Sequence, residues 1–175
     1  KTLRHEENDA ACPITCNGQY DTRWSKTMVG YDSEDKSYAL ELTYNYGVSS
    51  YDKGEGLKQF SLTLDDVARR ADLATSLGYA VVSGTGESKH IIGPDGYEFE
   101  LIPMLSSSMQ DNAFYMIVLA AADPSKLAAW YVDMLGMRYM PQVLEHPMAT
   151  SFLGFNESSV CFAIQAVPAQ PKITQ

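Results

Sequence analysis

The sequence predicts an α+β fold of tandem βαβββ modules, each of which forms a curved mixed sheet. From Leu57 to Met104 an alternating segment, a helix-like segment and three short strand-like segments follow one another. The same order recurs from Ala113 to Val167. A recurring order of elements indicates a repeated structural unit.

The second module is expected at residues 57–105. "LKQFSLTLDD" alternates as a strand, and "DDVARRADLATSLGY" begins at an aspartate cap and ends at Gly78. "AVVSG", "KHIIG" and "YEFELIPM" predict three further strands, the last two joined by the turn signal "PDG".

The third module is expected at residues 113–167, as the start of a second similar domain, after a polar linker at 106–112. Its strand "FYMIVLAAAD" precedes a helix that begins at Pro124 and ends at Gly136. "MRYMPQ", "TSFLGF" and "SVCFAIQAV" predict the last three strands, and residues 168–175 form a tail.

Residues 1–56 are expected to be the back half of a first module, without its front strand and helix. "KTLRHEE", "SKTMVGY" and "YALELTYNY" predict three strands, with an irregular insertion between the first two. Alternation along the last strand predicts that Glu41 and Asn45 face a cavity. The residues predicted to face the packing side are Tyr38, Leu40, Leu42 and Tyr44.

The composition of the chain indicates which classes of partner and which cellular compartment are expected. The net charge of −9 argues against nucleic acid and against a membrane surface as partners. No apolar run reaches the roughly 18 residues of a membrane span, and no signal peptide opens the chain. Cys12, Cys16 and Cys161 are too few for a disulfide scaffold. Reduced thiols are therefore expected, in the cytoplasm or, as an alternative, in mitochondria.

Three polar residues occupy related positions in the first two modules. Glu41 and Glu100 lie on the last strands, and Gln59 lies on the first strand of the second module. If the two modules face each other, these side chains meet in one cavity, where they suit a divalent cation. Paired carboxylates also supply acid–base chemistry. The alternative is that each glutamate simply faces solvent.

Several motifs resemble those of a known family. "ELTYNYGVSSYDKG", "FSLTLDDV" and "PDGYEFELI" resemble glyoxalase I, the lactoylglutathione lyase of the vicinal-oxygen-chelate superfamily. "LRHEE", "TCNGQYDTRWSKTMVGY" and the third module are similar to tandem glyoxalase-domain-containing proteins. The resemblance is strong over residues 1–103 and weaker over 113–167.

The resemblance implies a metal-dependent activity. The hemithioacetal of methylglyoxal and glutathione would be isomerised to S-lactoylglutathione with nickel, zinc or cobalt. Glu41 and Glu100 match metal ligands and bases, and Asn45 matches a glutathione contact. Gln59 stands where most members have a histidine ligand, and His90 is a pocket-rim residue that matches no ligand.

Other interpretations remain open. Met116 and Ala163 occupy the site positions of the third module, so no second metal centre is expected there. The chain could be a catalytically silent binding or protein-interaction module. A ring-cleaving dioxygenase would need two histidines, which the matching positions lack. Modules could pair within one chain or across a homodimer.

Overall fold

The structure is a computed structural model that describes residues 1–104, 113–141, 149–156 and 159–167. The predicted linker at 106–112 and tail at 168–175 lie outside these residues. Two compact units are present, Lys1–Asp52 and Lys53–Thr174, and each is described by itself. No helix among the described residues has the length and apolar character needed to cross a membrane.

The first unit is a three-stranded antiparallel sheet in the order β1-β2-β3. Its strands are β1 (Thr2–Asn8), β2 (Trp24–Gly30) and β3 (Ala39–Asn45). These are the three strands that the sequence predicts for the first module. The irregular insertion between β1 and β2 is anchored by the indole of Trp24, which donates a hydrogen bond to the carbonyl oxygen of Ala10 at 3.1 Å.

The prediction of reduced thiols is wrong for the two cysteines of this insertion. Reduced thiols were expected, but Cys12 and Cys16 form a disulfide, with Cα atoms 5.5 Å apart. The physical reason is a tight turn in which the amide of Thr15 donates to the carbonyl oxygen of Cys12 at 3.0 Å, bringing the cysteines within disulfide reach. Cys161 stays a free thiol. Disulfides are rare in the cytosol. The prediction of a cytoplasmic location therefore no longer has the support of reduced thiols, and it stays a prediction.

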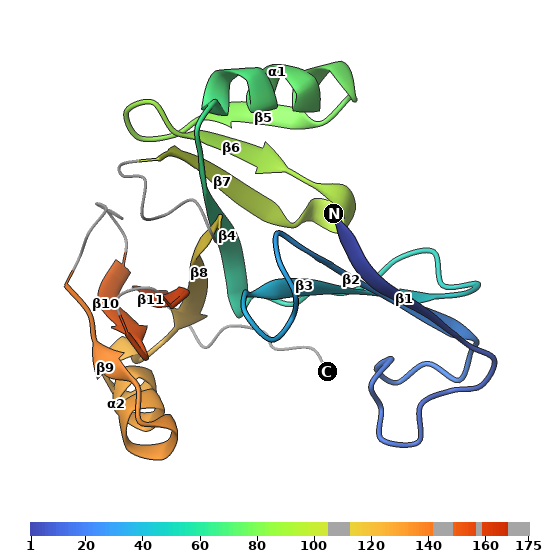
Figure 1. Cartoon of the computed structure of the whole chain (residues 1–175). Helices are drawn as coiled ribbons and strands as arrows, with labels where there is room; N and C mark the ends of the chain where they lie inside the picture. Colours follow the sequence, from blue (N-terminus) through green and yellow to red (C-terminus); the bar gives the residue numbers. More distant parts are fainter. Residues whose placement is uncertain (105–112, 142–148, 157–158, 168–175) are drawn as a thin grey trace. The chain divides into compact units, whose positions relative to one another are not determined.

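The second unit is built on an eight-stranded sheet in the order β5-β6-β7-β4-β8-β11-β10-β9 (Figure 1). One module consists of β4 (Leu57–Leu64), α1 (Val67–Ser76), β5 (Ala80–Ser83), β6 (Lys89–Ile92), a 3-10 turn η1 (Pro94–Gly96) and β7 (Glu98–Pro103). The next consists of β8 (Phe114–Ala121), α2 (Pro124–Leu135), β9 (Arg138–Tyr139), β10 (Ala149–Gly154) and β11 (Cys161–Ala166). The predicted βαβββ order is thus confirmed twice.

Both modules pair their strands in the same way. β4 runs parallel to β7 and β8 runs parallel to β11, while the other pairs within each module are antiparallel. The modules join edge to edge where β4 and β8 pair antiparallel, with Phe60 opposite Ile117. The second and third modules therefore pair within one chain and share one continuous sheet.

Local sequence signals determine where the two helices begin and where α2 ends. The carboxylates of Asp66 and Asp123 cap α1 and α2 by accepting hydrogen bonds from backbone amides. Gly136 ends α2 at a φ of 69°, where glycine meets little steric resistance. The helix α1 packs on β5–β7, and α2 packs on β8, β10 and β11 (Figure 1).

Two apolar clusters lie on opposite faces of the third module. The cluster under α2 contains the buried residues Ala121, Ala128, Met137, Leu153 and Ile164. The cluster on the other face contains Met116, Val118 and Ala163, with Cys161 and Tyr115 packed against it. Burial raises the pKa of the Cys161 thiol to about 11 and that of the Tyr115 phenol to about 12.

We expect the free energy of unfolding to fall as pH rises from about 9 to about 11. In this window the unfolded chain releases the Cys161 proton while the folded chain keeps it, so the unfolded state gains stability. Urea denaturation across the window would measure the fall. The Cys161→Ala variant, in which Tyr115 still titrates, should show a shallower fall, and an equal fall in both proteins would contradict the assignment.

Candidate functional site

A cluster of polar side chains lies on the strands β4 and β7 of the second unit. The Gln59 amide donates to Oε2 of Glu100 at 2.8 Å, and the Ser61 hydroxyl donates to the same oxygen at 2.9 Å. Gln59 and Ser61 are buried, and the Glu100 side chain is only 12% exposed. A carboxylate so enclosed keeps a fixed orientation, as a ligand or a base requires.

The register of the sheet explains the cluster. β4 and β7 run parallel with Ser61 beside Glu100, and Gln59 lies two residues before Ser61 on the same face. The structure therefore brings together two of the predicted ligands, Gln59 and Glu100. Ser61 was missed, because the sequence pattern shows the parity of a strand but not the register of its neighbour.

His90 lies on the third strand of the same module. It pairs directly across from Glu100 in the antiparallel β6–β7 ladder. Its Nε2 is 3.7 Å from Oε1 of Glu100, the oxygen that neither Gln59 nor Ser61 contacts in the structure. The carboxylate thus has one oxygen fixed by hydrogen bonds and the other turned toward an imidazole.

The third module presents apolar residues at the equivalent positions. Aligning the helix caps Asp66 and Asp123 matches Gln59 to Met116 and Ser61 to Val118. Ala163 pairs with Val118 as Glu100 pairs with Ser61. All three residues of the third module are buried, so this half of the shared sheet offers no ligand at these positions.

Glu41 belongs to the first unit, where it lies on β3 opposite Met28. It is exposed, and its Oε1 accepts a long hydrogen bond of 3.5 Å from the Thr43 hydroxyl. Glu41 and the Gln59–Glu100 pair lie in separate units, so their meeting at one metal stays a prediction. Among the described residues no group of three histidine, cysteine, aspartate or glutamate side chains comes together.

The other face of β3 differs from expectation. Tyr38 and Leu40 are partly buried, but Leu42 is 48% exposed and Tyr44 is 51% exposed. The prediction that these two residues are on a packed face is therefore wrong. The reason is that residues 1–52 contain no helix to cover that face, whereas α1 and α2 cover the corresponding strands of the other modules.

Asn45 lies at the end of β3 and is buried. Its Oδ1 accepts a hydrogen bond from the amide of Asn17 at 2.8 Å, and its backbone amide donates to the Tyr51 hydroxyl at 2.9 Å. Asn17 also accepts from the backbone amide of Cys12 at 3.0 Å. Asn45 therefore anchors the disulfide-containing insertion, and a role in glutathione binding stays a prediction.

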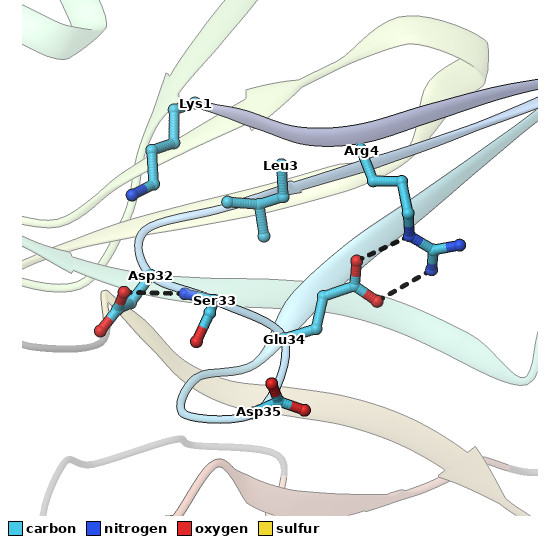
Figure 2. A pocket seen from close by; sticks show the side chains of 7 residues that line it. All are labelled: Lys1, Leu3, Arg4, Asp32, Ser33, Glu34 and Asp35. Carbon is cyan, nitrogen blue, oxygen red and sulfur yellow. Dashed lines mark hydrogen bonds and ion pairs between the residues drawn. The ribbon is translucent and has the colours of Figure 1, made fainter.

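A surface pocket lies elsewhere in the first unit (Figure 2). Its lining combines Lys1, Leu3 and Arg4 with the segment 32–35. The Arg4 guanidinium binds both carboxylate oxygens of Glu34 at 3.0 Å, which lowers the pKa of that carboxyl and raises the pKa of Arg4. Because Arg4 is thus occupied and no predicted site residue lines the pocket, we do not assign a function to it.

Comparison with known proteins agrees with these features. The chain is 34% identical over 170 residues to glyoxalase domain-containing protein 4 of Rattus norvegicus, covering 95% of this chain and 54% of that protein. It is 37% identical over 139 residues to glyoxalase 1 of Caenorhabditis briggsae, covering 78% of this chain and 46% of that protein. The chain is a homologue of proteins named glyoxalase. No protein-family model matches it.

Solved structures support the fold of the chain. Glyoxalase I from Zea mays superposes with a TM-score of 0.73 at 24% identity, covering 98% of this chain and 63% of that one. The predicted vicinal-oxygen-chelate fold is thereby confirmed. The chain spans about half the length of the curated relatives it matches, so the activity of a whole relative is only a proposal for this chain.

Proposed function

We propose that this chain supplies part of the active site of a metal-dependent lactoylglutathione lyase. The observation that carries the proposal is the buried Gln59–Glu100 pair, in which the carboxylate is fixed by two hydrogen bonds. Relatives named glyoxalase 1 and lactoylglutathione lyase, the latter from Arabidopsis thaliana at 30% identity over 144 residues, support the same substrate class.

The donor set fits a divalent cation. Oε1 of Glu100 and the carbonyl oxygen of Gln59 are the oxygens available to an ion in the second module, and Glu41 is the ligand proposed from the first. Oxygen donors of this kind accept nickel, zinc or cobalt, and they do not select among them. A bound ion would polarise the substrate oxygens and so acidify the adjacent carbon.

The residues would then carry out an isomerisation. Glu100 takes the carbon-bound proton of the methylglyoxal–glutathione hemithioacetal and returns it to the neighbouring carbon, while the hydroxyl proton passes to the former ketone oxygen, giving S-lactoylglutathione. Glu41 would act in the same way on the opposite enantiomer. Asn45 is proposed to contact the glutathione part of the substrate, near the insertion that it anchors.

One feature favours a catalytically silent binding module as a second candidate. The third-module face beside the Gln59–Glu100 pair is apolar, with Met116 and Ala163 both buried. That face offers no metal ligand at these positions, so it cannot complete a ring of ligands.

One assay separates the two functions. The full-length protein is loaded in turn with nickel, zinc and cobalt and mixed with preformed hemithioacetal, and its reaction is followed by thioester absorbance. Turnover with at least one metal is expected. Metal binding without turnover would support the silent module, and the absence of any metal binding would overturn the proposed site.

A further inference from the structure

The three modules differ at one position beside the proposed metal site. The residue across the antiparallel ladder from the site position is Met28 in the first module, His90 in the second and Phe152 in the third. An apolar side chain therefore occupies this place in two modules, and an imidazole replaces it in one. The exception is the module that also has Gln59, Ser61 and Glu100.

The geometry around Glu100 points to a ligand between its carboxylate and His90. Oε2 already accepts two hydrogen bonds, and Oε1 is 3.7 Å from Nε2 of His90. That distance is too long for a direct hydrogen bond. It is close to the roughly 3.4 Å that separates two ligand atoms held ~2.1 Å from one tetrahedral ion.

The position of the His90 ring depends on a glycine. A Cβ atom on Gly84 would lie 2.9 Å from Cδ2 and 3.1 Å from Nε2 of His90, so any larger residue would push the ring away. The loop that contains Gly84 is closed by a hydrogen bond from its amide to the Ser88 carbonyl at 3.0 Å, and Ser88 is buried. The "GTGESK" segment is thus a support for His90.

We propose that His90 is a metal ligand of this site, binding through Nε2 beside Oε1 of Glu100 and the carbonyl oxygen of Gln59. Position 59 has no imidazole, and His90 supplies one from β6. The second module then provides one nitrogen ligand and two oxygen ligands. Ser61 holds the other oxygen of Glu100 and so fixes the orientation of the ligand. This inference rests on the proposed function, because it concerns the same metal.

Cobalt binding tests the role of His90 without an activity assay. The 175-residue chain and its His90→Ala variant are titrated with Co²⁺ and followed by visible absorption, which reports nitrogen ligation, and by calorimetry. We expect His90→Ala to weaken binding by at least about 10-fold and to shift the spectrum. His5→Ala is the matched control, because His5 also lies beside a carboxylate, 3.1 Å from Glu7, but in the first unit.

A second measurement avoids variants altogether. In the unaltered chain, Co²⁺ should produce a paramagnetic shift of the His90 imidazole proton signals and leave those of His5 in place. If His90→Ala binds Co²⁺ with unchanged affinity and spectrum while Glu100→Gln does not bind it, the role of His90 is overturned and the proposed function stands. If the unaltered chain binds no Co²⁺, both are overturned.

Discussion

The Glu100→Gln variant is expected to lose about 10²–10⁴-fold in kcat/KM for the hemithioacetal, the usual contribution of a positioned general base. Glutamine keeps the shape of the side chain and can still accept hydrogen bonds from Gln59 and Ser61. It cannot take a proton from carbon, and it is a weaker ligand for a divalent ion. The loss would be measured by thioester absorbance with the metal content of each preparation determined in parallel.

Glu87→Gln is the matched control for this prediction. Glu87 lies in the same unit but is exposed, and no step proposed above uses it. Equal activity of Glu100→Gln and the unaltered chain would show that another group removes the proton. A normal metal content together with lost turnover would separate the role of base from the role of ligand.

The Leu153→Ala variant is expected to lower the free energy of unfolding by about 2–5 kcal/mol. Leu153 is fully buried on β10 and belongs to the cluster under α2, with Ala128 and Ile164. Truncation removes apolar contacts and leaves a cavity that close-packed neighbours fill only in part. Since domains are stable by only about 5–15 kcal/mol, the urea midpoint should fall substantially.

Leu73→Ala provides the comparison. Leu73 lies on α1 and is 50% exposed, so the same substitution there should change the free energy of unfolding by about 0.5 kcal/mol or less. If the two variants were equally stable, the cluster would not be the structural core of the third module.

The sequence predicted those parts of the molecule that depend on local signals. The helix caps Asp66 and Asp123 and the stop at Gly136 act within a few residues, so they could be recognised without tertiary information. The recurrence of these signals predicted two complete βαβββ modules. The matching positions of the site residues in the repeated modules likewise predicted that Gln59 and Glu100 lie at one site.

Features that depend on neighbouring strands or on covering elements could not be predicted. The contact of Ser61 with Glu100 depends on the register between β4 and β7, and the approach of His90 depends on the β6–β7 ladder. The Cys12–Cys16 bond depends on a turn that sequence spacing alone does not specify. The exposure of Leu42 depends on the absence of a covering helix in residues 1–52.

The pairing of β4 with β8 has a consequence for how the chain can be divided. Each of these strands would become an unpaired edge if the second and third modules were separated, and each carries an apolar, β-rich sequence. Exposed edges of this kind promote intermolecular strand pairing and aggregation. The repeated unit of the sequence is therefore smaller than the unit that folds, and the two modules are expected to be stable only when expressed together.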